Sequence, residues 1–227
     1  MSDSRRPAGE GKRGSPAVSV GPSRILAVCL FATLFSVYLL TFSGVYHSSD
    51  EMAMLATTDS LARRGAWDIE LLRWMGEQQG SFGPDGHLYS RKGIGTTLAA
   101  LPVYWLALRT GGLLAVGNVQ AAMLTNAILT ALTGVLVYGS LRRLAYRDGI
   151  ALVTALAFGL GTMAWPYARY LFSETLAGLG LMLSFYALLR YRDRNDAFSV
   201  LLAGVGLGVA LLARLNNAIV VPFFGLL

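Results

Sequence analysis

Long apolar runs separated by short basic clusters dominate the pattern of this chain. Five of the runs carry no charged residue and approach or exceed the length that a helix needs to cross a bilayer, roughly 20 residues. An ionised side chain at the bilayer centre costs about 2.5 to 3.5 kcal/mol, so charge-free runs mark membrane spans. The pattern therefore predicts an all-α fold, a polytopic transmembrane helix bundle with spans at about 25–44, 118–141, 149–167, 175–189 and 197–213.

The two ends of the chain differ in character. Residues 1–23 are rich in Ser, Gly and Pro, include four basic residues and have almost nothing to bury, which predicts a disordered basic tail. The apolar run that follows has the length of a full span and lacks a convincing cleavage site, which favours a retained signal anchor over a signal peptide. A sixth apolar segment begins at Leu215 and stops at Leu227, so we interpret residues 24–227 as one domain that is truncated at its C-terminus.

The segment 93–108 is apolar but short, and Pro102 in its middle removes a backbone donor. We expect a re-entrant or interfacial helix there, not a span. With that choice, the tail and the basic clusters at 140–148 and 190–196 fall on one side of the membrane, as the positive-inside bias requires. The sequence thus predicts a multi-pass protein of the cell membrane with a cytoplasmic N-terminus and an extracytoplasmic loop at 45–117.

Composition agrees with a membrane environment. Hydrophobic residues make up 54% of the chain and charged residues only 14%, and the mean hydropathy is +0.52. The net charge of +6 comes from clusters between apolar runs, which is a topology signal and not the continuous basic face of a nucleic-acid-binding protein. Cys29 is the single cysteine, so no intrachain disulfide and no CxxC metal site can form.

The extracytoplasmic loop opens with a helix signal. Ser48 is followed three residues later by Glu51, which is the spacing of a capping box, and Gly65 provides a helix stop. Asp50 and Glu51 then lie in the first turn of an amphipathic helix on the membrane surface. Their simplest interpretation is that they complement the helix dipole, a contribution of about 0.3 to 1 kcal/mol.

Three segments together resemble a known family. The first is the acidic pair after the first span, with its helix that ends in Gly65 and a Trp; the second is the stretch YSRKGIGTTLAALPVYWLA from Tyr89 onward. The third joins the turn WPYARYLFSE at 165–174 to the glycine-rich run at 204–214. In this order they resemble the N-terminal part of the GT-C membrane glycosyltransferases, of the protein O-mannosyltransferase and aminoarabinose transferase type.

The resemblance implies an inverting transfer of a sugar from a polyprenyl-phosphate donor to an acceptor hydroxyl at the outer membrane face. It assigns Asp50 as the general base and Glu51 as an alternate base or the partner of Asp50. It assigns substrate binding to Arg91, Lys92, Arg169 and Glu174. The cationic side chains among them would lie beside the leaving phosphate. Interfacial anchoring of Arg91 and Lys92, and dipole complementation by Glu174, remain open as alternatives.

A non-catalytic or transport-related membrane protein is the rival interpretation. A transporter would place ionisable groups inside its spans or show paired interrupted helices, and neither feature is present in the sequence. The predicted partners are the polyprenyl-phosphate-linked sugar donor and membrane lipids, with no nucleic acid. No cofactor is assigned, and participation of a divalent metal stays open because His47, His87 and the scattered acids form no ligand cluster.

Overall fold

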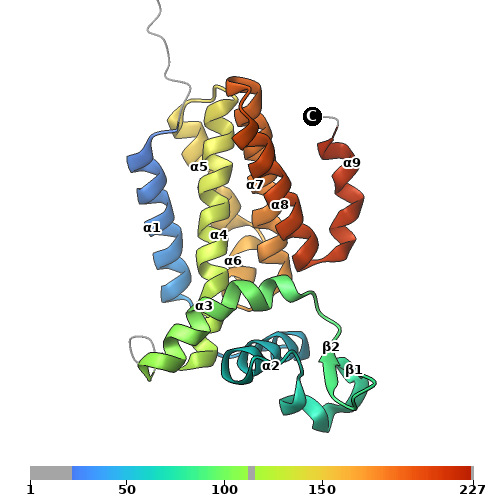
Figure 1. Cartoon of the computed structure of the whole chain (residues 1–227). Coiled ribbons are helices and arrows are strands. Elements are labelled where there is room, and N and C mark those ends of the chain that lie inside the picture. The colour runs from blue at the N-terminus through green and yellow to red at the C-terminus, as the bar shows by residue number, and fades with distance from the viewer. Residues whose placement is uncertain (1–21, 112–115, 226–227) are drawn as a thin grey trace, which may run out of the picture.

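The computed structural model describes residues 22–111 and 116–225, and most of them are helical. Five helices stand side by side in Figure 1 and form a bundle: α1 (Arg24–Leu40), α4 (Asn118–Arg143), α5 (Asp148–Gly161), α7 (Ser173–Arg194) and α8 (Ala197–Ala213). Within the described residues, α4 alone is long and apolar enough to cross a membrane by itself, whereas α1, α5 and α8 are apolar but shorter. The predicted tail at 1–23 lies almost entirely outside the described residues.

Small residues let the helices of the bundle approach closely. A Cβ atom on Gly206 of α8 would lie 2.6 Å from the carbonyl oxygen of Gly180 in α7, and Ser184 Oγ donates to the carbonyl of Ala203 at 2.5 Å. On the other side of α4, the Leu34 methyls occupy the space over Gly134 and Gly159. Backbone approach of this kind is the usual basis of helix packing in membranes. Within the glycine-rich run of α8, Gly206 therefore serves helix packing.

Two of the apolar runs are shortened or divided in the structure. Helix α1 ends at Leu40 and not at residue 44, and the run at 149–167 is divided between two helices because α5 ends at Gly161. Thr162 has an extended backbone, and its hydroxyl donates to the carbonyl of Phe158 at 2.6 Å and accepts from the N–H of Ala164 at 3.1 Å. The hydroxyl thus ends α5 and begins the short helix α6 (Ala164–Ala168), which accommodates Pro166 near its N-terminus.

One end of the bundle is covered by two further helices. Helix α3 (Ile94–Thr110) lies across this end, and α2 (Ser49–Arg64) packs against α3 on the side away from the bundle (Figure 1). Thr97 Oγ1 donates to the carbonyl of Met54 at 3.5 Å, and the Tyr104 hydroxyl donates to Asp59. Helix α3 thus lies crosswise to the helices of the bundle (Figure 1). Helix α2 is covered on several sides, and most of its residues between Glu51 and Ser60 are buried.

The capping of α2 follows the sequence prediction. Ser48 Oγ accepts from the Glu51 N–H at 3.2 Å, Glu51 Oε2 accepts from the Ser48 N–H at 3.1 Å, and Gly65 ends the helix with φ +69°. A left-handed residue after the last turn is what glycine permits at low cost. The predicted capping box and helix stop are therefore confirmed.

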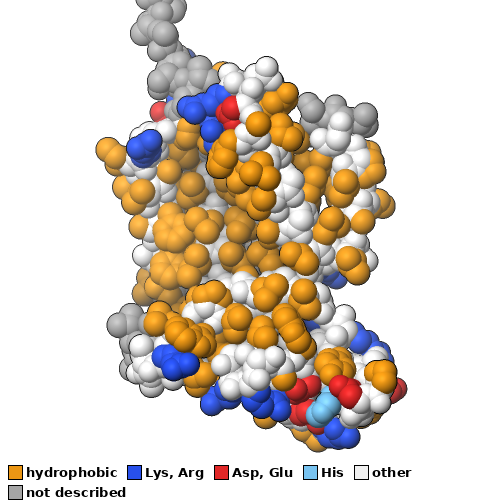
Figure 2. Space-filling view, viewed as in Figure 1, with side chains coloured by type: hydrophobic (Ala, Val, Ile, Leu, Met, Phe, Trp, Pro, Cys, Tyr) orange, Lys and Arg blue, Asp and Glu red, His pale blue; other side chains and the backbone are white. Residues whose placement is uncertain are grey.

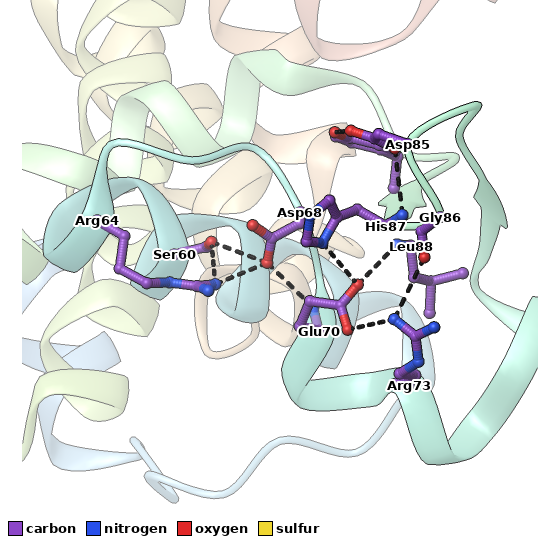
Figure 3. Close-up of polar contacts among 10 residues, drawn as sticks. Ser60, Arg64, Asp68, Glu70, Arg73, Asp85, Gly86, His87 and Leu88 are labelled. Atoms are coloured by element: carbon purple, nitrogen blue, oxygen red, sulfur yellow. Dashed lines mark hydrogen bonds and ion pairs between the residues drawn. The ribbon is translucent and has the colours of Figure 1, made fainter.

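The region after α2 contains a small sheet that the all-α prediction did not include. The short 3₁₀ segment η1 (Glu70–Gln78) leads into β1 (Gly80–Phe82), which pairs antiparallel with β2 (Leu88–Ser90). Glu70 holds the hairpin to η1, because its carboxylate accepts from the Leu88 N–H at 2.9 Å and from Arg73 at 2.8 Å (Figure 3). The mostly helical fold thus carries a two-stranded lobe beside α2.

The surface separates apolar and charged residues along the long axis of the molecule. On the face shown in Figure 2, hydrophobic side chains cover the bundle, while charged side chains gather toward its two ends. Past α8, the chain turns into η2 (Leu215–Val220) and α9 (Val221–Phe224), which run back beside α8 (Figure 1). The apolar belt between two charged ends is the surface that a bilayer core and its two interfaces require.

Candidate functional site

A cavity of about 500 Å³ lies where α2, the entry to α3, the α6–α7 turn and the end of α8 meet. This corner is at the α3 end of the bundle (Figure 1). The segments come from four separate parts of the chain, and each contributes a polar side chain. The cavity is lined by Asp50, Met54, Arg91, Lys92, Gly93, Tyr167, Phe172, Ser173, Glu174, Ala213, Arg214, Leu215 and Asn216.

Asp50 faces this cavity from the first turn of α2. Its Oδ2 atom lies 2.7 Å from Nζ of Lys92, and the side chains of Asp50 and Lys92 are 44% and 33% exposed. The capping box fixes the turn that carries Asp50, and the hairpin delivers Lys92 directly after β2. The structure therefore brings together a carboxylate and an ammonium group that the sequence places far apart.

Glu174 and Arg214 form a second ion pair in the same cavity. Arg214 Nη1 contacts Glu174 Oε1, and both side chains are partly exposed. Glu174 lies in the first turn of α7, and Arg214 directly follows α8. Glu174 thus lines the cavity, and it also sits where an acid complements the dipole of α7.

Arg91 reaches the cavity from the end of the hairpin. Its Nε atom donates to Ser81 Oγ at 3.1 Å, and its backbone N–H donates to the carbonyl of Gln79 at 3.3 Å. These contacts tie the orientation of Arg91 to strand β1. The cavity therefore contains three cationic side chains, those of Arg91, Lys92 and Arg214, against the two carboxylates of Asp50 and Glu174.

Glu51 takes a different position from Asp50. Its side chain is fully buried and does not line the cavity. Oε2 accepts from the N–H groups of His47 at 2.8 Å and Ser48 at 3.1 Å, and Oε1 accepts from the N–H of Leu171 at 2.9 Å. A carboxylate with both oxygens engaged in this way is suited to holding segments together and not to accepting a proton from a substrate.

Arg169 also lies outside the cavity, in contrast to the expected substrate-binding role. Its Nη1 atom donates to the carbonyl of Thr41 at 3.1 Å, and its guanidinium lies 5.6 Å from the ring centroid of Tyr170. The side chain therefore joins the α6–α7 turn to the end of α1. The sequence places Arg169 only five positions before Glu174, but the backbone between them directs the two side chains to different surroundings.

Most of the residues that line the cavity lie outside the sequence-based set of site residues. Among the polar ones are Tyr167, Arg214 and Asn216, none of which the resemblance assigned to the site. The position of Arg214 directly after a charge-free helix could have identified it as a candidate residue from the sequence. Its pairing with Glu174, however, depends on the antiparallel packing of α7 and α8. Within the described residues, no three His, Cys, Asp or Glu side chains are grouped as a metal site would require.

The fold and the cavity define a mostly helical protein with an apolar bundle and a charged cavity at one of its ends. The sequence model of the dolichyl-phosphate-mannose-protein mannosyltransferase family matches residues 94–227, which is more than half of the chain. The chain belongs to this family. No curated protein and no solved structure gives a significant match.

Family membership establishes the general class of the protein. It is a membrane glycosyltransferase of the kind that uses dolichyl-phosphate mannose as donor and a protein as acceptor. The matched region begins at α3 and includes Glu174 and Arg214, whereas Asp50, Arg91 and Lys92 lie before it. The class agrees with the mannosyltransferase part of the sequence resemblance and favours a transferase over the transport-related alternative.

Proposed function

We propose that this chain transfers mannose from a polyprenyl-phosphate donor to a hydroxyl group of a protein acceptor, with Asp50 as the general base. The observation that carries the proposal is the single cavity that holds the Asp50 carboxylate together with three cationic side chains. Glycosyl transfer from a lipid phosphate needs a base near the acceptor oxygen and positive charge near the leaving phosphate. Family membership supports the donor and acceptor classes.

The proposed reaction is a single displacement. The acceptor oxygen attacks the anomeric carbon of the sugar while Asp50 takes the proton from the hydroxyl. The bond from the anomeric carbon to the phosphate oxygen breaks, and its electron pair leaves with the polyprenyl phosphate. Attack from the face opposite to the phosphate inverts the configuration at the anomeric carbon.

The charges of the cavity suit a phosphate ligand. Three cations against two carboxylates leave an excess of positive charge, and both carboxylates are already paired, Asp50 with Lys92 and Glu174 with Arg214. A phosphate placed beside Lys92 would compete with Asp50 for the ammonium group. In this proposal, donor binding therefore releases Asp50 for the acceptor hydroxyl and uses Lys92 to neutralise charge on the leaving group.

An apolar groove next to the cavity supports a lipid-linked donor. The groove has a volume of about 530 Å³, runs between α3 and α8, and shares Lys92, Gly93 and Leu215 with the cavity. Its other lining residues are Ile94, Gly208, Leu211 and Leu212. An isoprenoid chain along this groove would bring its phosphate to Lys92, where the apolar wall gives way to the charged cavity.

The proposed topology places this cavity at the non-cytosolic face of the cell membrane. The basic clusters at 140–148 and 190–196 belong to the opposite end of the helices that lead to it, at the α4–α5 and α7–α8 turns. Positive clusters are retained on the cytosolic side during insertion. The N-terminus is then cytosolic, and the acceptor reaches the site from outside.

The test is an in-membrane transfer assay with a panel of polyprenyl-phosphate sugars and the variant Asp50→Asn. We expect transfer from the mannose donor, and a loss of about 10²-fold to 10⁴-fold in Asp50→Asn with unchanged membrane insertion. Asp85→Asn is the matched control, because Asp85 lies in the hairpin turn outside the cavity. Full activity of Asp50→Asn would exclude Asp50 as the base.

A further inference from the structure

Three consecutive residues before Glu174 are held from two sides by buried polar side chains. The segment Tyr170, Leu171 and Phe172, named here the 170–172 segment, joins α6 to α7. Asn126 of α4 donates through Nδ2 to the carbonyl of Tyr170 at 2.6 Å and to the carbonyl of Phe172 at 2.8 Å. Glu51 of α2 accepts from the N–H of Leu171 at 2.9 Å.

These contacts follow from a tight turn at Leu171. The N–H of Phe172 donates to the carbonyl of Tyr170 at 3.0 Å, while the carbonyls of Tyr170 and Phe172 accept from Asn126 of α4 and the N–H of Leu171 donates to Glu51 of α2. Phe172 itself is extended, with φ −104° and ψ 145°, and leads into α7. The Leu171 side chain is fully buried with Met54, Tyr104 and Met123, which excludes water as a substitute partner for this backbone.

Asn126 is specialised for this one segment. Its side chain is fully buried, and every hydrogen bond of its Nδ2 atom goes to the 170–172 segment or to Thr175 Oγ1 at 3.1 Å in the first turn of α7. Its Oδ1 atom has no hydrogen-bond partner within the described residues. A buried amide that is only half satisfied is costly, so its retention in an apolar helix points to a role in fixing the segment.

Glu51 connects the same segment to the general base. Glu51 directly follows Asp50, and its carboxylate also accepts from His47 and Ser48, so it fixes the first turn of α2 and the 170–172 segment to each other. Glu174 comes two residues after Phe172. One chain of contacts, from Asn126 through the 170–172 segment to Glu51, therefore connects the two helices that carry the cavity carboxylates.

We propose that Asn126 and Glu51 are positioning residues of the transferase site, which hold the 170–172 segment and thereby fix Asp50 relative to Glu174 and Arg214. Neither side chain lines the cavity, so neither is a catalytic residue. The inference rests on the proposed function for its kinetic consequence. Its structural half, that the two side chains hold this segment, is independent of any activity.

The structural half is tested by hydrogen–deuterium exchange of the full chain in detergent or nanodiscs. Asn126→Leu removes both donations to the 170–172 segment and the donation to Thr175, and it keeps a buried side chain of similar length. We expect faster exchange in peptides that cover residues 169–174. Exchange in the hairpin at 80–90 should stay unchanged. Thr125→Val is the matched control, because Thr125 is the buried neighbour on α4 and its hydroxyl has no partner within the described residues.

The kinetic half uses the same variants in the transfer assay. We expect kcat to fall about 10-fold to 100-fold in Asn126→Leu, since small misplacements of reacting groups have effects of this size. The KM for the donor should change much less. Asn126→Ser keeps one short donor and should recover part of kcat, and it replaces Asn126→Leu if that variant does not insert.

A double variant separates positioning from general destabilisation. Glu51→Gln and Asn126→Leu release the same segment, so their combined loss in kcat/KM should be smaller than the product of the single losses. The losses in kcat/KM of Lys92→Ala and Asn126→Leu should multiply. Unchanged exchange at 169–174 in Asn126→Leu would overturn the proposal. Faster exchange with an unchanged kcat would overturn the link to catalysis. If the parent chain transfers no sugar, the proposed function fails, and exchange still decides whether Asn126 and Glu51 hold the segment.

Discussion

Nζ of Lys92 lies 2.7 Å from Oδ2 of Asp50, at the point where the hairpin returns to the start of α2. The contact joins the start of α2 to the end of the two-stranded lobe beside it. It also places the proposed base beside the cation proposed for the donor phosphate. Lys92 thus contributes both to the stability of the fold and to the proposed transfer. Its replacement should affect these two properties to different extents.

Replacement of Lys92 should affect transfer far more than stability. Exposed ion pairs contribute about 0.2 to 1 kcal/mol, and both partners here are about one third or more exposed, so Lys92→Ala should lower the free energy of unfolding by less than about 1 kcal/mol. Transfer should fall at least tenfold, mostly through the KM for the donor. Thermal unfolding in detergent and steady-state kinetics measure the two effects. Equal KM values for parent and variant would argue against the phosphate role.

Glycines of α8 should differ sharply in their response to alanine. Gly206→Ala places a Cβ atom 2.6 Å from the Gly180 carbonyl oxygen and 2.8 Å from the Ser184 nitrogen, so α7 and α8 must move apart at a cost of about 1 to 3 kcal/mol. Gly204→Ala meets nothing within 4 Å and should be neutral or stabilising, because alanine favours the helix. Melting temperatures of the two variants give the comparison. Equal destabilisation would contradict the packing of α7 on α8.

Acid should loosen the hairpin lobe through Glu70. Hydrogen bonding from Arg73, together with the Leu88 N–H, lowers the pKa of Glu70 from 4.5 to about 2. Because the pKa is lower in the folded lobe, the stabilisation is complete above about pH 4.5 and is lost as the pH falls toward 2. Limited proteolysis of the hairpin should therefore accelerate across this window in the parent chain.

Two neighbouring carboxylates contribute in the same direction. Burial acts to raise the pKa of Asp68, but hydrogen bonds from the Glu70 N–H, Arg64 and Ser60 outweigh it and leave that pKa lowered (Figure 3). A hydrogen bond from the Tyr89 hydroxyl lowers the pKa of Asp85. Glu70→Gln should therefore weaken the lobe at neutral pH and reduce, without abolishing, its acid sensitivity. An unchanged pH profile in Glu70→Gln would show that Glu70 does not hold the hairpin.

The proposed sidedness can be tested by cysteine labelling. Cys29 is exposed and is first replaced by Ser to remove the native thiol. A cysteine at Glu77 in η1 should then react with a membrane-impermeant maleimide in intact cells, whereas one at Arg192 should react only after permeabilisation. The reverse pattern would place the cavity in the cytosol and exclude a donor that is presented at the outer face.

Local features of the fold could be predicted because they depend on residues close in sequence. The capping box of Ser48 and Glu51 and the stop at Gly65 are contacts within one helix and its ends. Charge-free runs indicated α4, α7 and α8 within a few residues of their bounds. The hairpin was not predicted, because its strands have three residues each and are held by the long-range contact of Glu70 with Leu88.

The sequence by itself determined the apolar runs and the helix caps, because charge-free stretches and capping contacts act over short distances along the chain. The family resemblance added Asp50, Lys92 and Glu174 as candidate site residues. Only the tertiary structure decided which of these side chains share a cavity. It paired Asp50 with Lys92 and Glu174 with Arg214, directed Arg169 to Thr41, and buried Glu51 against Leu171. These outcomes depend on how α3 crosses the bundle and how α7 packs on α8, which no local pattern specifies.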